Sequence, residues 1–224
     1  MWVVIIMSHT SNKPQKIHFG QVAYKFKVSQ GLVDRINAKC ETLDDKTTAQ
    51  NYLVGKIKNE YHFLPYISEV DTDEEIKNSI YYTVDDCPQD NCYEIEEVDM
   101  NSAWVNDQYE NEYQGVHTHS GKEDLGFSSI LYLKVPDFGK EITDTGDPLN
   151  GRTELIGNCG GIWNSPTHLI KPKVGDFYIF PYDMQHVVYP FTGDGMRRSL
   201  VCNFDIKRYK KYSMKKGKRY EYNK

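Results

Sequence analysis

The sequence predicts one mainly β domain with flanking helices, whose core is a double-stranded β-helix (a jelly roll). Eight short segments with strand character follow residue 93, and Gly, Pro, Asp and Asn separate them. Helical periodicity is confined to the residues before them. At 224 residues, the chain fits a single domain, residues 1–224, better than two very small ones.

The N-terminal part, residues 1–92, is expected to supply a strand and supporting helices. Residues 18–28 alternate as a strand does, and Ser29 then precedes apolar residues at helical spacing, as an N-cap would. Two further helices are expected over residues 51–62 and 69–80. The opening MWVVIIM is interpreted as an extra strand or an upstream start, because it is far shorter than the ~20 residues that span a bilayer.

The β core is predicted over residues 93–206. Its strands are expected at residues 102–110, 113–120, 127–136, 153–157, 168–172, 175–181, 185–191 and 197–206. Short strands at this spacing are typical of jelly rolls and barrels, and the preceding helices would pack on one side.

Charge and cysteine content limit the partners of the chain. Residues 207–224 carry nine bases and one acid, whereas the other 206 residues carry 18 bases and 31 acids. The acidic body argues against binding along a phosphate backbone, so nucleic acid is not the expected partner, and the basic tail is interpreted as a solvated terminus. Five cysteines without a CxxC pair predict a reducing, cytoplasmic setting, with no membrane association.

Two histidines stand one residue apart in the segment GVHTHSGKEDLG. Because strand side chains alternate, His117 and His119 would share one face. In a double-stranded β-helix, His186 at the start of QHVVYPF would be brought beside them. Such imidazoles, with acids at hand in Glu123 and Asp124, have the ligand chemistry of a non-haem Fe(II) site with open positions.

An arginine pair opens the last predicted strand, RRSLVCNFDI. Alternation places Arg197 and Ser199 on one face and Arg198 on the other. An inward arginine is costly in a small barrel unless it meets an anion, and a guanidinium can bind a carboxylate with two parallel hydrogen bonds. Arg197 and Ser199 therefore predict a site for an organic acid near the metal, while Arg198 is expected to be exposed.

Taken together, the motifs HxH, SILYLKVP, KPKVGDFYIFP, QHVVYPF and RxSLVCNF resemble the 2-oxoglutarate and Fe(II) dependent oxygenases. The similarity covers about residues 101–206 and is greatest to small members from tailed phages of marine bacteria. It implies that His117 and His186 bind iron, and that Arg197, Ser199 and Tyr132 hold the far carboxylate of 2-oxoglutarate. Tyr132 matches a tyrosine of prolyl hydroxylases. The implied reaction consumes O2, hydroxylates a substrate and releases succinate and CO2, with ascorbate as an accessory reductant.

The sequence departs from the family pattern at one iron ligand. The usual carboxylate stands two residues after the first histidine, where this chain has His119. By position, His119 is the preferred third ligand. The alternative is that Asp124 or Glu123 binds the iron, and that His119 contacts the ligands without binding the iron itself. Loss of a carboxylate ligand would weaken Fe(II) retention.

The resemblance suggests a protein or peptide substrate, with peptidyl proline first, in the host cytoplasm if the chain is viral. Two rival functions remain open. A cupin that does not use 2-oxoglutarate would bind Mn, Fe, Ni or Zn through His117, His119, Glu123 and His186, but it has no standing need for Arg197. A structural or carbohydrate-binding jelly roll of a virion would leave the placement of these residues unexplained.

Overall fold

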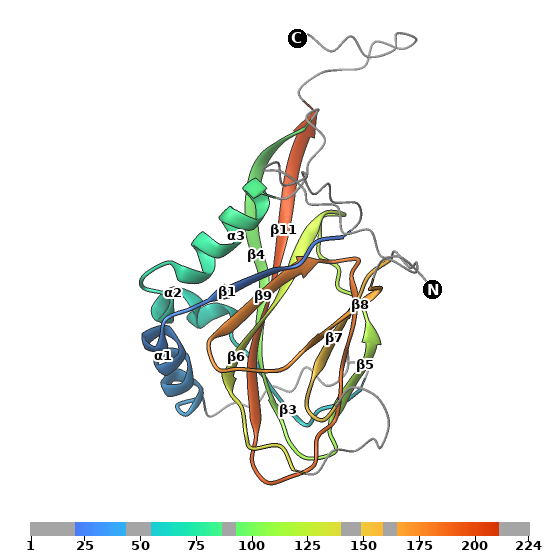
Figure 1. The fold of residues 1–224 in the computed structure, drawn as a ribbon. Coiled ribbons are helices and arrows are strands. Elements are labelled where there is room, and N and C mark those ends of the chain that lie inside the picture. The colour runs from blue at the N-terminus through green and yellow to red at the C-terminus, as the bar shows by residue number, and fades with distance from the viewer. Residues whose placement is uncertain (1–20, 44–54, 87–92, 140–148, 159–164, 211–224) are drawn as a thin grey trace, which may run out of the picture.

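In the computed structural model, two antiparallel sheets form the core and helices lie against one of them (Figure 1). The structure describes residues 21–43, 55–86, 93–139, 149–158 and 165–210. The opening MWVVIIM and the basic tail beyond residue 210 lie outside the described residues.

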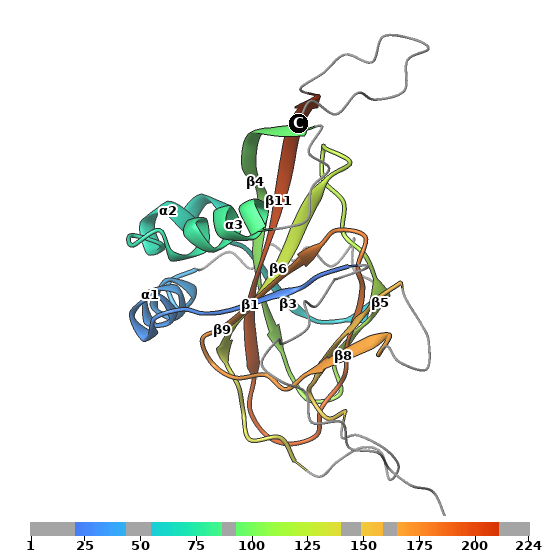
Figure 2. The ribbon, with the colours of Figure 1, turned by 45° about the horizontal axis from the view of Figure 1, so that its top comes forward.

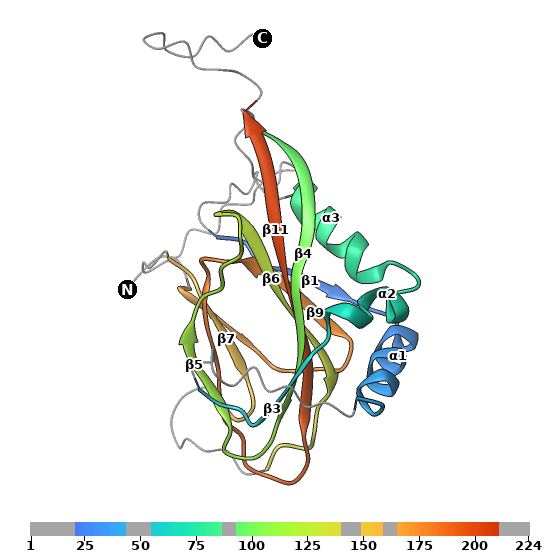
Figure 3. The same cartoon turned by 180° about the vertical axis from the view of Figure 1, so that it is seen from behind.

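The larger sheet has six strands in the order β1-β9-β6-β11-β4-β3. Its two longest strands, β4 and β11, pair along their whole lengths (Figures 1 and 3). The bounds of the six strands are Tyr24–Lys27 (β1), Asn59–His62 (β3), Tyr93–Gln108 (β4), Gly126–Lys134 (β6), Asp176–Pro181 (β9) and Arg197–Lys210 (β11).

The smaller sheet has five strands in the order β2-β5-β10-β7-β8, and it faces the larger sheet across the interior (Figure 2). Its strands are Gly55–Lys56 (β2), Tyr113–His117 (β5), Thr153–Ile156 (β7), Thr167–Ile170 (β8) and Gln185–Val188 (β10). The eight strands expected after residue 93 are thus confirmed, with shifted ends. The two curled antiparallel sheets confirm the predicted double-stranded β-helix with flanking helices.

The helices cover the outer face of the larger sheet (Figures 1 and 3). They are α1 (Gln30–Cys40), a 3-10 turn (Leu64–Tyr66), α2 (Ile67–Val70) and α3 (Glu75–Asp86). The predicted cap of α1 is confirmed, since the backbone N–H of Leu32 donates to the Ser29 hydroxyl. The helix expected over residues 69–80 is divided between α2 and α3. No helix among the described residues is long and apolar enough to span a membrane.

The helix predicted over residues 51–62 is wrong: in its described part, the chain forms β2 and β3. Ile57 and Tyr61 are both buried, and their spacing of four mimics one face of a helix. Tyr61 instead pairs with Val105 of β4, and Gly55 pairs with Gln114 of β5. Pairing with two distant strands outweighed the local pattern.

Alternating residues of the larger sheet enter two separate apolar clusters. One cluster lies between this sheet and the helices, and the other fills the interior between the sheets. The helix side receives Tyr61, Val105, Leu131 and Leu200, whereas the interior receives Trp104, Ile130, Tyr132 and Val201. On these strands, therefore, only every second residue has a side chain that can reach a site inside the barrel.

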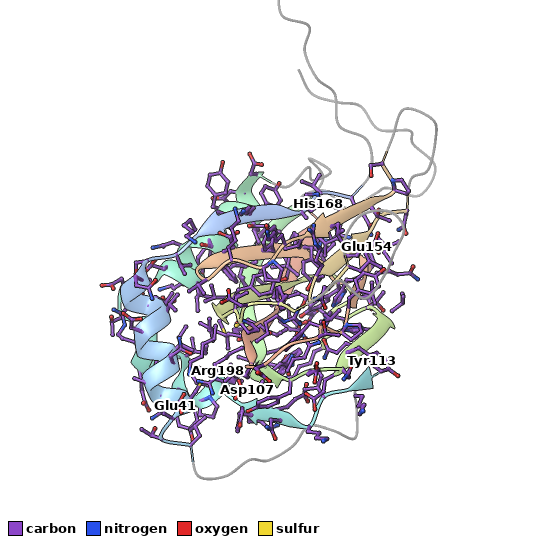
Figure 4. All side chains as sticks on the ribbon, turned by 60° about the horizontal axis from the view of Figure 1, so that its bottom comes forward. Glu41, Asp107, Tyr113, Glu154, His168 and Arg198 are labelled. Atoms are coloured by element: carbon purple, nitrogen blue, oxygen red, sulfur yellow. The ribbon has the colours of Figure 1, made fainter. Side chains whose placement is uncertain are left out.

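Arg198 is buried, which corrects the expectation that it would be exposed. Its Nε and Nη2 donate to the two carboxylate oxygens of Asp107 at 2.7 and 2.8 Å, and its Nη1 donates to Glu41 at 2.8 Å. Figure 4 shows these three residues together beside α1. Alternation gave the correct face of β11, but α1 covers that face and excludes water from it.

We expect Arg198→Ala to lower the free energy of unfolding by about 3–5 kcal/mol, because Asp107 would be left as a buried, unpaired charge. Urea denaturation followed by circular dichroism measures the change. The control Lys207→Ala removes a base whose side chain is 48% exposed, and should change stability by less than about 0.5 kcal/mol. Equal stabilities of the two variants would contradict this account.

Candidate metal centre

The pairing of β5 with β10 brings two histidines from distant parts of the chain together. His117 lies directly opposite His186 in this antiparallel pair, and the centroids of their rings are 4.1 Å apart. Paired residues of neighbouring strands project from the same face of a sheet. Both imidazoles therefore belong to one site on the smaller sheet.

His119 reaches the same site from outside the strand. The prediction that residues 113–120 are extended is wrong at its end, because β5 stops at His117. The backbone N–H of His119 donates to the carbonyl of Tyr182 at 3.0 Å, which holds the loop against the turn before β10. Its ring stacks on that of His186 with 4.9 Å between centroids, and the two Nε2 atoms are 3.2 Å apart.

The three histidines can act as ligands of one ion. One nitrogen from each lies within 4.8 Å of the others. His117 Nδ1 is 2.7 Å from the carbonyl of Gly115, and His186 Nδ1 is 3.3 Å from that of Met184. A carbonyl can only accept, so these contacts place a proton on Nδ1 and leave Nε2 free for a metal.

The environment keeps these imidazoles neutral. Burial lowers the pKa of His186 to about 2, and the nearby His117 and His119 add to that shift. Burial likewise lowers the pKa of His119 to about 3, and it lowers the pKa of His117. Neutral imidazole is the form that binds metal, so the site needs no deprotonation of its histidines at neutral pH.

The alternative ligands Glu123 and Asp124 lie elsewhere. Both are exposed, and neither belongs to the cluster of possible ligand atoms found among the described residues. The four-ligand set that a cupin would need, with Glu123, is therefore not assembled. Within the described chain, the cluster consists of three imidazoles and contains no carboxylate.

Arg197 is a buried cation in the interior, and its side chain lacks an acid partner. It is 3% exposed, and no carboxylate of the described residues lies within 4.0 Å of its guanidinium. Nη1 donates to the carbonyl of Gly151 at 2.9 Å, while Nε has no partner. A buried charge without a counter-charge destabilises the fold, so this arrangement suits an anionic ligand.

Tyr132 and Ser199 lie beside this guanidinium on the same interior face. Ser199 pairs with Tyr132 across β11 and β6, and the Tyr132 ring is 5.9 Å from the Arg197 guanidinium carbon. The Tyr132 hydroxyl donates to Thr153, which pairs with Val188 two residues beyond His186. Tyr132, beside the guanidinium, thus contacts β7 at a level two residues from His186 along β10, a spacing that a short dicarboxylate can bridge.

Glu60 is an interior residue that sequence reasoning missed. Its exposed fraction is 0%, neither carboxyl oxygen has a hydrogen-bond partner, and burial raises its pKa to about 7. Glu60 pairs with Asn106 of β4 on the interior face. Alternation along a strand would have placed it there, but the segment was assigned to a helix.

A cavity of about 450 Å³ opens beside the histidines, between the edge strands β1 and β8. Lys25 of β1 and His168 of β8 are among the residues that line its sides. Leu155 and Met184 also line it; Leu155 pairs with His186, and the Met184 carbonyl contacts the His186 ring. The cavity is thus adjacent to the metal centre.

Comparison with solved structures identifies the architecture. HygX from Streptomyces hygroscopicus, with nickel, 2-oxoglutarate and hygromycin B bound, is 12% identical, with 83% of this chain and 82% of HygX covered and a TM-score of 0.54. A prolyl hydroxylase from Trichoplax adhaerens, in complex with a peptide fragment of hypoxia inducible factor, is 14% identical, with 83% of both chains covered and a TM-score of 0.53. At such identities the likeness shows a shared fold.

The chain also spans 54% of a 2OG-Fe(II) oxygenase family oxidoreductase from Burkholderia pseudomallei, at 13% identity over 61% of this chain and a TM-score of 0.40. No curated protein matches the chain. A family model described as "Putative 2OG-Fe(II) oxygenase" matches residues 102–203, which include the three histidines, Arg197, Ser199 and Tyr132. Over this β core, the chain is thus similar in sequence to the 2OG-Fe(II) oxygenase family.

Proposed function

We propose that this chain is a 2-oxoglutarate- and Fe(II)-dependent dioxygenase whose iron ligands are His117, His119 and His186. The observation that carries the proposal is the joint presence, in one interior, of three neutral imidazoles within reach of one ion and a buried guanidinium with no acid partner in the described part of the chain. Bound iron would supply the oxidising chemistry with O2 and 2-oxoglutarate: one oxygen atom enters the C–H bond of the substrate, the other enters succinate, and CO2 is released.

Each residue of the chain then has a defined task. The backbone contacts of His117 and His186 orient their Nε2 atoms toward the ion. Arg197, Ser199 and Tyr132 bind the far carboxylate of 2-oxoglutarate. The guanidinium and the Ser199 hydroxyl donate charge-assisted hydrogen bonds to it, and the Tyr132 hydroxyl does so when Thr153 becomes the donor of their mutual hydrogen bond. Phe180, whose ring centroid is 4.9 Å from that of His186, excludes water from the same side.

For the substrate, we propose a protein or peptide, with a prolyl side chain first. The cavity between β1 and β8 is flanked by the edge strands of the two described sheets, beside which an extended peptide can lie. One structural neighbour carries a peptide, whereas another carries hygromycin B. The acidic body of the chain disfavours nucleic acid.

We further propose a reducing cytoplasm as the setting, that of the host if the chain is of phage origin. The two cysteines in the described residues, Cys40 and Cys202, are buried free thiols. Fractionation of cells that express the protein tests this setting, and recovery from an oxidising compartment would oppose it.

We expect Arg197→Ala to weaken 2-oxoglutarate binding about 100-fold, because two charge-assisted hydrogen bonds are lost. Calorimetric titration of the nickel-loaded protein measures this, and nickel content should be unchanged. The control Arg208→Ala alters an exposed arginine and should bind normally. Equal affinities of all three proteins would remove the role of Arg197, and no binding by any of them would favour a cupin without 2-oxoglutarate.

His119→Ala should reduce bound iron or zinc to well below one ion per chain, because two neutral imidazoles remain as ligands. Asp124→Ala and Glu123→Ala serve as matched controls and should retain the metal. Elemental analysis after dialysis against a weak chelator gives the comparison. If His119→Ala retains the metal and either control loses it, the three-histidine assignment is wrong.

Proline-containing peptides should increase succinate formation several-fold over the uncoupled rate, with a mass gain of one oxygen on the peptide. Incubation with Fe(II), 2-oxoglutarate, O2 and ascorbate, followed by mass spectrometry, provides the measurement. Boiled enzyme and Arg197→Ala are the controls. If small-molecule substrates alone are oxidised, the peptide proposal fails while the dioxygenase assignment stands.

A further inference from the structure

Glu60 belongs to a cross-strand row of residues inside the barrel. Glu60 pairs with Asn106, Asn106 pairs with Ser199, and Ser199 pairs with Tyr132. Residues paired in this way project from one face. Tyr61, the next residue along β3, packs on the helix side instead. The Glu60 carboxyl therefore faces the same interior as the proposed metal and 2-oxoglutarate sites.

The row lies between the imidazoles and the buried guanidinium. On β4, the interior residue that precedes Asn106 is Trp104, whose ring centroid is 5.9 Å from that of His119. The interior residue that follows Asn106 is Gln108, which pairs with Arg197. By register, Glu60 is therefore level with the stretch of β4 between Trp104 and Gln108. It is not among the ligand atoms that lie within 4.8 Å of one another.

This carboxyl lacks the contacts that buried acids normally have. Both oxygens of Glu60 are without a hydrogen bond, whereas Asp107 is paired with Arg198 and Asp176 with Lys25. Burial is the one cause of its raised pKa. Without a ligand, the acid is therefore held partly or wholly neutral near pH 7.

The other charged or titratable groups that face this interior determine what could ionise Glu60. β4 contributes only neutral side chains there, and Lys58 and His62 on either side of Glu60 are exposed. The charged or titratable groups directed into the same interior include Arg197 of β11, Tyr132 of β6, Tyr178 of β9 and the three histidines, and the buried Asp205 lies further along β11, where it accepts from the Tyr182 hydroxyl. Arg197 is the cation among them.

The ion, its three histidine ligands, Arg197 and 2-oxoglutarate together leave one positive charge uncompensated. A divalent ion and Arg197 together bring three positive charges, and 2-oxoglutarate brings two negative ones. The three imidazoles bring none, because the cluster contains no carboxylate. Buried charges are stable when they are compensated, and an ionised Glu60 would make the sum zero.

We propose that Glu60 is the counter-charge of the metal centre: it stays outside the ligand set and releases its proton to solvent when a divalent ion binds the three histidines. This inference rests on the proposed function, because it takes the histidines as the metal ligands. Glu60 acts through the field of its charge, as a positioning residue for the ion, and replaces in effect the ligand carboxylate that the sequence lacks.

Proton release on metal binding is the first test. Zinc alone is titrated into the apo protein near pH 6 in buffers of different ionisation enthalpy. We expect wild type to release close to one proton more per zinc than Glu60→Gln, because proton loss from the ligands is common to both proteins and the glutamine has no proton to lose. Glu60→Asp should restore the release. Equal release by wild type and Glu60→Gln would overturn the proposal.

Affinity and coordination provide the second test. Near pH 7.5, Glu60→Gln should bind zinc about 10- to 100-fold more weakly, as for other residues that support a metal site from behind its ligands. The matched control Glu96→Gln alters a 49% exposed acid and should bind as wild type does. With cobalt, the visible absorption bands should keep their shape in Glu60→Gln. A changed spectrum would make Glu60 a ligand and overturn its role as an outlying charge.

The two proposals fail in different ways. If neither wild type nor Glu60→Gln binds zinc at the histidines, the metal centre itself is wrong. If both bind zinc with equal affinity and equal proton release, the metal centre stands and only the role of Glu60 is lost.

Discussion

The site depends on the register between β5 and β10, which sets His117 opposite His186. Side chains alternate along a strand, so a slip of one residue would turn one imidazole out of the barrel. The larger sheet contributes an independent constraint, because the pairing of β11 with β4 and β6 directs Arg197 inward. The proposed metal ligands and the proposed cosubstrate residues thus come from different sheets and face the interior between them.

Two adjacent arginines illustrate how the fold separates stability from ligand binding. Arg198 points toward α1 and is neutralised by Asp107 and Glu41. Arg197 points into the barrel, where its described surroundings offer it a carbonyl and an aromatic face but no acid. The protein therefore satisfies one buried guanidinium with its own carboxylates and leaves the other for an anion from outside.

Much of this arrangement could be predicted from the sequence, because alternation and turn residues report directly on strands. Such local patterns predicted the eight strands of the core, the Ser29 cap and the inward direction of the Arg197 side chain. The burial of Arg198 did not, since a pattern gives the face of a strand but not what covers it. Glu60 was hidden for another reason: Ile57 and Tyr61 imitate helical spacing, and only pairing with β4 and β5 makes their segment extended.

The central claim is that three imidazoles and one guanidinium share a metal-bound dicarboxylate. A crystal structure of the protein grown with cobalt and 2-oxoglutarate, with the ion located by anomalous diffraction, tests it most directly. The account predicts a single ion about 2.0–2.2 Å from one nitrogen each of His117, His119 and His186, with the far carboxylate against Arg197. An ion bound elsewhere, or one held by a carboxylate of the chain in place of His119, would contradict it.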